Sequence, residues 1–477
     1  MIDTKEALKK YFGFASFKVV QKETIDSILR GADTFTVLPT GTGKSLCYQL
    51  PSYLMSGQTV IVSPLISLME DQVSQLRQMG EKSVIAINST LDFSTKKYVL
   101  AHLKEFKFIF VSPETLNQEE VFNVFKQLDI SLFVIDEAHC ISEWGHDFRP
   151  SYLQLKENLN QLNQPLTLAL TATATETVKK DIEQELFSTR NFSEFIYSVN
   201  RENIYYQVEE CEDKVEYLKQ FLLTKNSPGI IYFSSKKEAE RVAMLLNEIL
   251  PYSVAFYHGD LSGADRIKIQ QQFIHDEIRI LCATSAFGMG VNKENIRFVI
   301  HYHLPDSLEN YVQESGRAGR DGKQSISIIL YQKGDERIHY YLQDESYHQK
   351  KDLLFLKGKT KEDLKKYASS LTDIQKKWLN MLEKNNWNWD NFEQNLNSKQ
   401  FEKRTKTQEM GFYIENKSCR RQNIINYFNN HYEKVSQEIC CDNCTPDKII
   451  DFEEKDGTIL KKEPFNSKEL LKKLFLI

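Results

Sequence analysis

Three groups of residues have the types and spacing that suit phosphate chemistry. The first is the run LPTGTGKS, which begins at Leu38 and ends at Ser45. Glycines in such a run let backbone N–H groups close on phosphate oxygens, the lysine adds a positive charge, and the serine hydroxyl can bind Mg²⁺. The strict pattern has glycine where Leu38 stands, which weakens the pattern more than the chemistry. The residues expected to hold a nucleotide here are Thr40, Gly41, Thr42, Gly43, Lys44 and Ser45.

The second group is a pair of adjacent carboxylates, Asp136 and Glu137, at the end of an apolar run. We expect Asp136 to hold Mg²⁺ together with Ser45. We expect Glu137 to orient and deprotonate an attacking water, because hydrolysis of a γ-phosphate depends mostly on positioning and charge neutralisation. Taken alone, the pair is equally typical of a solvated helix cap. Its place about 90 residues after the Gly-Lys-Ser run favours the catalytic interpretation.

The third group is the run QESGRAGR at residues 313–320, which carries Arg317 and Arg320. Their spacing predicts that both arginines lie on one side of a helical turn. An arginine can stabilise the charge on a phosphoryl group during its transfer. A residue in this role is called an arginine finger, and it raises the rate of hydrolysis by about 10³–10⁵-fold. In isolation the run is also typical of a basic surface turn. If the arginines belong to a different domain than Lys44, hydrolysis requires the two domains to close on each other.

The elements that position these groups follow from alternating apolar and amphipathic stretches. Short apolar runs, each followed by a polar turn and often a helical pattern, predict parallel strands covered by helices. The first set of runs is 34–38, 59–62, 108–111, 132–135 and 167–170, and the second is 229–233, 253–257, 278–282, 298–301 and 325–331. After Glu336 the strands fade and helical, lysine-rich sequence follows. The expected class is therefore α/β, with two tandem sheet domains followed by a helical region.

Composition limits the class of protein. The 477 residues are too many for one compact core, and 41% hydrophobic with 27% charged residues is ordinary for a soluble protein. The net charge of −5 means that any nucleic-acid contact needs a local basic face. We find no apolar run of about 18 residues and no signal-peptide pattern. The expected location is cytoplasmic, in the bacterial cytoplasm or nucleoid, or nuclear in a eukaryote.

Four of the eight cysteines cluster late in the chain, namely Cys419, Cys440, Cys441 and Cys444. In a reducing compartment this clustering favours a metal site over disulfides, and four thiolates suffice for a closed structural zinc site. Adjacent side chains on extended backbone point apart, so Cys440 and Cys441 can share one ion only where the backbone kinks. Two alternatives stay open. His431 could replace one cysteine, or the site could hold no metal, with Cys440 as a small buried apolar residue.

Taken in order, these motifs resemble those of the RecQ family of superfamily 2 helicases, from about Leu8 to Cys444. The block FGFASFKVVQ at residues 12–21 looks like the family's adenine-reading motif. The resemblance implies that Phe14 stacks on the base, that Gln21 binds its edge and that Lys18 packs over it. The family usually has arginine at position 18, and the two cations stack differently. Without the family, the block is also typical of an amphipathic helix whose aromatic residues pack in the core.

The block ISEWGHDFRP at residues 141–150 is similar to the family's aromatic-rich loop. The resemblance implies that this loop binds single-stranded DNA, because stacking surfaces combined with charge suit sequence-tolerant binding. The residues concerned are Trp144, His146, Phe148 and Arg149. A loop joined directly to Glu137 could report the presence of DNA to the phosphate site. The alternative is a buried aromatic turn.

The resemblance implies two RecA-like domains (1–200 and 201–338), a helical zinc-binding domain (339–445) and a short charged tail (446–477). The implied activity is an ATP-dependent 3′–5′ DNA helicase that uses ATP, Mg²⁺ and Zn²⁺ in recombination and repair. Its expected partners are single-stranded and tailed duplex DNA, and single-strand-binding protein, with no membrane. Because about 30 residues follow Cys444, we expect a short member of the family, without the winged-helix domain and without the helicase-and-RNaseD C-terminal (HRDC) domain. The alternatives are a translocase with little unwinding, an RNA helicase, and a binding module without ATPase activity.

Overall fold

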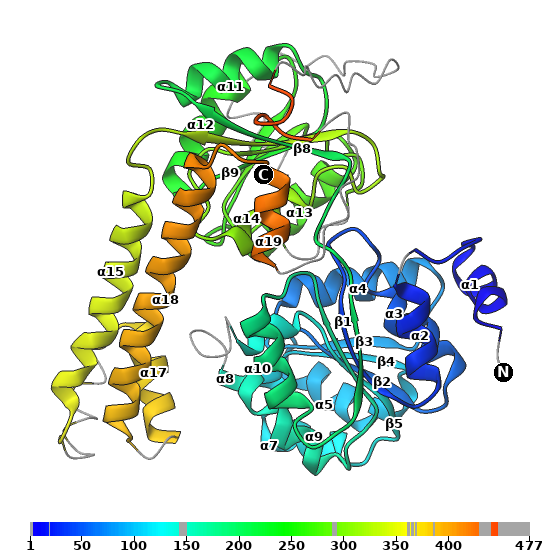
Figure 1. Ribbon diagram of the computed structural model, residues 1–477. Coiled ribbons are helices and arrows are strands. Elements are labelled where there is room, and N and C mark those ends of the chain that lie inside the picture. Colours follow the sequence, from blue (N-terminus) through cyan, green and yellow to red (C-terminus); the bar gives the residue numbers. More distant parts are fainter. Residues whose placement is uncertain are drawn as a thin grey trace.

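Two α/β bodies and a helical arm make up this computed structural model (Figure 1). It describes residues 3–18, 20–142, 150–288, 293–359, 363, 367, 370–384, 387–428 and 440–446. The first body contains the N-terminal part of the chain, and the second contains residues from about 200 onward. In Figure 1 the arm extends from the second body and runs beside the first. No helix of the described residues is long and apolar enough to cross a membrane.

The first sheet has seven strands in the order β3-β4-β2-β5-β6-β1-β7, and its strand pairs are parallel. The strands are β1 (Asp33–Val37), β2 (Gln58–Val62), β3 (Val84–Ile87), β4 (Phe108–Val111), β5 (Ile130–Ile135), β6 (Thr167–Thr171) and β7 (Phe192–Ile196). Since β1, β6 and β5 are neighbours, the chain leaving β1 and the chain leaving β5 emerge at the same edge of the sheet. This edge therefore holds both the Gly-Lys-Ser run and the Asp-Glu pair.

Helices cover both faces of this sheet (Figure 1). They are α1 (Thr4–Phe12), α2 (Gln21–Leu29), α3 (Leu46–Leu54), α4 (Ile66–Gln78), α5 (Phe93–Ala101), α6 (Pro113–Leu116), α7 (Glu119–Phe125), α8 (Pro150–Leu153), α9 (Leu155–Gln161) and α10 (Glu176–Leu186). The strand β6 illustrates why continuous apolar runs form such strands. Leu168 and Leu170 pack in one buried cluster, and Ala169 packs in the cluster on the opposite face. A strand buried on both faces must be apolar throughout.

The second sheet has six strands in the order β10-β11-β9-β12-β13-β8, again with parallel pairs. The strands are β8 (Ile204–Glu210), β9 (Gly229–Tyr232), β10 (Val254–Tyr257), β11 (Ile280–Ala283), β12 (Phe298–His301) and β13 (Ser325–Tyr331). Its helices are α11 (Lys214–Leu223), α12 (Lys236–Ile249), α13 (Gly263–Ile274) and α14 (Leu308–Ser315). The two tandem parallel-sheet domains predicted from the sequence are confirmed.

Three strands lie outside the apolar runs that the sequence singled out. Strand β3 has only four residues, two of them half-buried, and every described side chain of β7 is at least partly exposed. Strand β8 is buried only over its first three residues and then becomes polar. These strands lie at the sheet edges, where one flank has no partner strand among the described residues and burial selects apolar residues less strongly.

The arm consists of helices α15 (Arg337–Lys351), α17 (Asp373–Lys384) and α18 (Trp389–Glu415), and α19 (Arg420–Tyr427) follows it. The outer part of the arm has a small core of its own, built around Leu353, Trp389 and Phe392. The end of α18, helix α19 and two cysteines instead join the core of the second sheet. The cysteine-bearing segment is therefore built onto the second α/β domain.

Candidate functional site

The Gly-Lys-Ser run forms a tight loop between β1 and α3, in which Gly41 and Gly43 have φ of 83° and 81°. Glycine is required at both positions. A Cβ at Gly41 would lie 2.8 Å from Cγ of Arg320, and one at Gly43 would lie 2.8 Å from Nε2 of Gln21. Backbone N–H groups ahead of a helix form an anion site, as the sequence predicts for phosphate.

The acidic pair reaches this loop from β5. Lys44 Nζ lies 2.9 Å from Glu137 Oε1, and both side chains are largely buried. Glu137 has φ of 50°, an unfavourable backbone conformation for a non-glycine residue, which points to a constrained site. Burial raises the pKa of Asp136 to about 6, and the neighbouring Glu137 charge adds to this effect. Burial alone would also raise the pKa of Glu137, but the charges of Lys44 and His139 hold it below its ordinary value.

A chain of polar contacts connects Glu137 with the second domain. His139 Nδ1 lies 3.4 Å from Glu137 Oε2 and 2.8 Å from Thr171 Oγ1. The Thr171 hydroxyl donates to the Thr173 carbonyl at 3.1 Å. Thr173 Oγ1 in turn accepts a hydrogen bond from Gln313 Nε2, also at 3.1 Å. These contacts thus connect Glu137, the residue expected to activate water, to the run that carries the two arginines.

Arg317 and Arg320 lie in turns that follow α14, which ends at Ser315, so the predicted helical turn is wrong. Gly319 has φ of 57°, which a continuing helix would not allow. Arg317 donates to the Gly288 carbonyl, and its charge lowers the pKa of Glu137. Arg320 packs on the phosphate loop at Gly41. Burial, followed by the charges of Arg317 and Arg201, lowers the pKa of Arg320 to about 9. Such crowded, buried positive charge favours a bound anion.

The block expected to read adenine lies against the same loop. Gln21 is buried, and its Nε2 donates to the carbonyls of Thr42 at 2.7 Å and Gly43 at 3.2 Å. Lys18 Nζ donates to the Gly41 carbonyl at 3.1 Å. Phe14 is 56% exposed, which does not fit a core-packing role for this ring. Gln21 and Lys18 are thus brought together beside the phosphate loop, and the exposed ring of Phe14, four residues before Lys18, is open to solvent.

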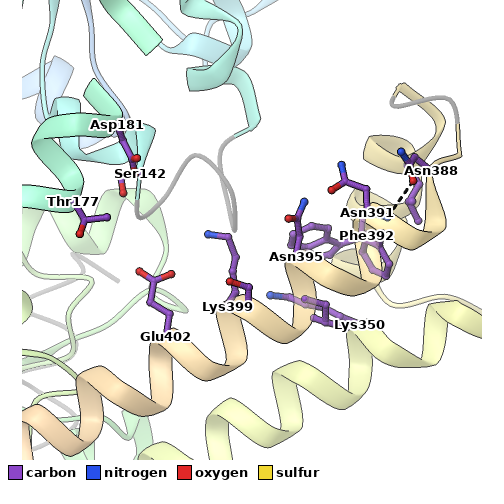
Figure 2. Close-up of a pocket in the computed structure, with 14 residues that line it drawn as sticks. Ser142, Thr177, Asp181, Lys350, Asn388, Asn391, Phe392, Asn395, Lys399 and Glu402 are labelled. Carbon is purple, nitrogen blue, oxygen red and sulfur yellow. Dashed lines mark hydrogen bonds between the residues drawn. The ribbon is translucent and has the colours of Figure 1, made fainter. Parts of the chain in front are cut away.

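The four residues of the aromatic-rich loop, Trp144, His146, Phe148 and Arg149, lie outside the described residues, as does His431. Ser142, the second residue of this loop, lines a cavity of about 270 Å³ between the first domain and the arm (Figure 2). Thr177 and Asp181 of α10 form one wall. The facing ridge of α18 carries Asn391, Asn395, Lys399 and Glu402. Figure 2 shows the Lys399 and Glu402 side chains pointing across the gap toward α10.

The four clustered cysteines converge, with all four sulfur atoms within 4.8 Å of one another. The Sγ atom of Cys419 lies 3.5 Å from that of Cys440 and 4.0 Å from that of Cys441. Zinc–sulfur bonds of about 2.3 Å in a tetrahedron require sulfur atoms about 3.8 Å apart, so the arrangement fits a zinc ion. Directly after Cys441 the chain turns, and Cys444 N donates to the Cys441 carbonyl at 3.0 Å, which brings Cys444 back to the cluster.

The cysteine loop docks on the exposed edge of the second sheet. Tyr206 N donates to the Cys440 carbonyl at 3.4 Å, and Asp442 N donates to the Tyr206 carbonyl at 3.0 Å. The carboxylate of Asp442 accepts from Val208 N at 2.9 Å and from Arg420 Nε at 3.0 Å. These bonds cover the unpaired backbone of β8, which is otherwise an edge strand.

One participant in the interdomain contact, Arg201, was missed by sequence reasoning. It lies in the linker between β7 and β8, and it donates to the Thr40 carbonyl at 2.9 Å and to the Gly316 carbonyl at 3.0 Å. The Thr40 hydroxyl also donates to the Gly316 carbonyl, at 3.1 Å. The acceptors are backbone carbonyls, which leave no sequence signal, so a single sequence could not have identified this contact.

Three families match successive parts of the chain. Residues 18–181 match the DEAD/DEAH box helicase family, residues 213–322 match the helicase conserved C-terminal domain, and residues 372–445 match the RecQ zinc-binding family. The chain is 40% identical to the probable ATP-dependent DNA helicase RecS of Bacillus subtilis (strain 168), over 98% of this chain and 96% of that protein.

Two longer relatives carry the name ATP-dependent DNA helicase RecQ. The one from Bacillus subtilis is 38% identical over 75% of this chain, and the one from Haemophilus influenzae is 41% identical over 69%. The chain spans 60% and 53% of their respective lengths.

Solved structures share the fold at low sequence identity. The helicase Lhr of Mycobacterium smegmatis, bound to single-stranded DNA and AMP-PNP, is similar with a TM-score of 0.58 and 20% identity. That match covers 70% of this chain and 48% of Lhr. Mss116p, bound to single-stranded RNA and AMP-PNP, gives a TM-score of 0.59 and 20% identity, over 72% of this chain and 75% of that protein. Both support the tandem-domain fold.

Proposed function

Because the chain belongs to the RecQ family of ATP-dependent DNA helicases, we propose that it hydrolyses ATP to move 3′ to 5′ along single-stranded DNA and to separate duplex strands. The observation that carries this proposal is the meeting of the two domains at one phosphate site. The loop of Lys44 and the acidic pair come from the first sheet, and Arg317 and Arg320 come from the second. A site divided in this way couples hydrolysis to the relative position of two domains.

In this site we assign each residue one role. Lys44 and the loop N–H groups bind the β- and γ-phosphates of ATP. Glu137 orients and deprotonates water, which is consistent with the lowered pKa that keeps it ionised. Arg320 stabilises the charge that develops on the γ-phosphate, and Arg317 supports it. Ser45 and Asp136 would hold Mg²⁺, which neutralises phosphate charge. Phe14, Lys18 and Gln21 would hold the adenine.

We assign the cysteine cluster to a structural zinc ion held by Cys419, Cys440, Cys441 and Cys444. The sulfur spacing and the match to the RecQ zinc-binding family support this assignment. Four protein ligands leave no open position for catalysis, so the contribution of the zinc would be to stability. Its place on the edge of β8 would stiffen the second domain.

For the DNA path we propose the aromatic-rich loop and the cavity beside it. Trp144, His146, Phe148 and Arg149 supply stacking surfaces and charge. The amide and lysine ridge of α18 faces the residues that lead into this loop (Figure 2). Amide and ammonium groups bind phosphate and sugar oxygens without reading bases, which suits movement along any sequence.

The test is strand displacement on three DNA duplexes, one with a 3′ tail, one with a 5′ tail and one blunt, with ATP turnover followed in the same tubes. Displacement confined to the 3′-tailed duplex is the expected result. DNA-stimulated turnover without displacement would make the chain a translocase instead. Stimulation by single-stranded RNA in preference to DNA would overturn the choice of substrate.

The cellular setting follows from the activity. An enzyme that opens tailed duplexes serves recombination and repair, and in a bacterium it works in the cytoplasm or nucleoid. It leaves single strands that single-strand-binding protein would coat. Microscopy of a fluorescent fusion after DNA damage, together with the survival of a deletion strain, tests this setting. A fusion that stays away from the nucleoid, or a strain with normal survival, would contradict it.

A further inference from the structure

Two arginines, one half-buried and one fully buried, lie one behind the other between the cysteine cluster and the phosphate site. Arg201 belongs to the linker between the two α/β domains, and Arg421 belongs to α19, two residues after Cys419. Arg421 is 1% exposed and lies over the ring of Tyr206, with its Cζ 5.2 Å from the ring centroid. Neither arginine contributes to the roles assigned above.

The Arg201 guanidinium joins the two halves of the phosphate site. One of its nitrogens donates to the carbonyls of Thr40 at 2.9 Å and Gly316 at 3.0 Å. The other donates to the carbonyls of Ala318 at 3.1 Å and Gly319 at 2.8 Å. Because the planar guanidinium donates to four carbonyls, both its position and its orientation are fixed. It therefore sets the distance between the phosphate loop and the turns that carry the two catalytic arginines.

Arg421 hydrogen-bonds to the backbone of the linker that carries Arg201. One of its nitrogens donates to Asn200 Oδ1 at 2.8 Å and to the Arg201 carbonyl at 2.7 Å. The other donates to the Ile204 carbonyl at 2.6 Å and, more weakly, to the Cys440 carbonyl at 3.4 Å. The linker is thereby clamped from the side of the cysteine cluster over the whole segment from Asn200 to Ile204.

We propose that Arg421 and Arg201 are positioning residues that link the zinc-binding module to ATP hydrolysis. Arg421 fixes the linker, the linker orients Arg201, and Arg201 places Arg317 and Arg320 against the phosphate loop. The inference deepens the proposed function and rests on it. It assigns the module a second role besides stability, because loss of the clamp would leave ATP bound but the arginines displaced. A displacement of about 1 Å at a catalytic group can cost about 10²-fold in rate.

The test compares two neighbouring arginines of α19. Lysine in place of Arg421 can reach one acceptor but not all four, so Arg421→Lys should lower kcat for ATP by about ten- to 10²-fold, with KM for ATP unchanged. An unchanged KM indicates a loss confined to the transition state. Arg420→Lys is the matched control, because the Arg420 side chain is also buried but, among the described residues, hydrogen-bonds only to Asp442 and to carbonyls at the end of α18. It should lower the unfolding temperature and leave kcat in place.

A third variant acts from the other end of the contact. Asn200→Ala removes one acceptor of Arg421 without touching the cysteine module, so it should lower kcat in the same direction while zinc content stays at the wild-type level. Arg201→Lys combined with Arg421→Lys should cost no more than the larger single loss, since both act through one path.

Wild-type turnover reports on the proposed function, and the ratio of variant to wild type reports on the arginine pair, so the two can fail separately. All variants are assayed with saturating single-stranded DNA, below their unfolding temperatures and with zinc content measured. Equal kcat for Arg421→Lys, Asn200→Ala and the wild type would overturn the proposal. So would a loss in Arg420→Lys that matches the loss in Arg421→Lys.

Discussion

Lys44 and Glu137 form an ion pair of 2.9 Å across the phosphate site, one from the loop after β1 and the other from the end of β5. In this state the lysine faces the residue that we propose as the general base. Arrival of a γ-phosphate would give Lys44 a new partner and release Glu137 to bind water. The pair therefore holds the two side chains together, and the charge of Lys44 lowers the pKa of Glu137.

Replacing Glu137 by glutamine removes the base but keeps the size of the side chain. We expect Glu137→Gln to bind ATP and to lose turnover by about 10²–10⁴-fold, the range that general base catalysis contributes. Single-turnover hydrolysis and the binding of a fluorescent ATP analogue separate the two effects. Undiminished turnover in this variant would remove Glu137 from the mechanism.

Arg320 packs on Gly41, so its position depends on the closure of the two domains. Arg320→Lys keeps the charge but loses the planar fork, and we expect turnover to fall by about 10³-fold, within the range for arginine fingers. Lys323→Ala, an exposed cation three residues along, is the control and should behave like the wild type. A comparable loss in both variants would mean that general surface charge, and not the finger, matters.

The apolar runs predicted most of the strands, because a strand buried on both faces must be apolar along its length. The spacing of the two motifs predicted that Lys44 and Glu137 share one site, and they meet because β1 and β5, separated by β6, end at the same edge of the sheet. Arg201 and Arg421 could not be predicted, because most of their acceptors are backbone carbonyls that only the assembled fold brings close. The turns that hold Arg317 and Arg320 were misjudged because spacing alone cannot show that a helix ends at Ser315.

A second interdomain contact gives a dependence on pH. Asp71 on α4 accepts from Gln270 on α13 at 2.7 Å, and burial raises the pKa of Asp71 to about 6, against the hydrogen bond from Gln270. The folded protein thus binds this proton more tightly than the unfolded chain, so the stabilising contribution is present below about pH 4 and is lost as the pH rises through about 6.

The variant Asp71→Asn keeps an oxygen that can accept from Gln270 but has no charge to bury. Its unfolding temperature should exceed that of the wild type above about pH 6, and the difference should shrink toward pH 4. Thermal unfolding of both proteins across this range measures the difference. A gap that stays constant with pH would mean that Asp71 does not titrate there.

Zinc removal should loosen the cysteine loop from the edge of β8. A strong chelator should lower the unfolding temperature and speed hydrogen exchange at the backbone N–H groups of Tyr206 and Val208, which bond to this loop. Cys444→Ser should reproduce the effect and reduce the zinc content. Cys211→Ser is the control, because Cys211 lies outside the cluster. Unchanged exchange after complete zinc loss would contradict a structural role.

A motor on DNA must couple hydrolysis to its track, so the decisive measurement is ATP turnover while single-stranded DNA is titrated in. The wild type and Arg320→Lys should be measured side by side. We predict that DNA raises turnover in the wild type to a plateau, and that Arg320→Lys binds DNA but stays near the basal rate. Wild-type turnover that does not respond to DNA would contradict the account.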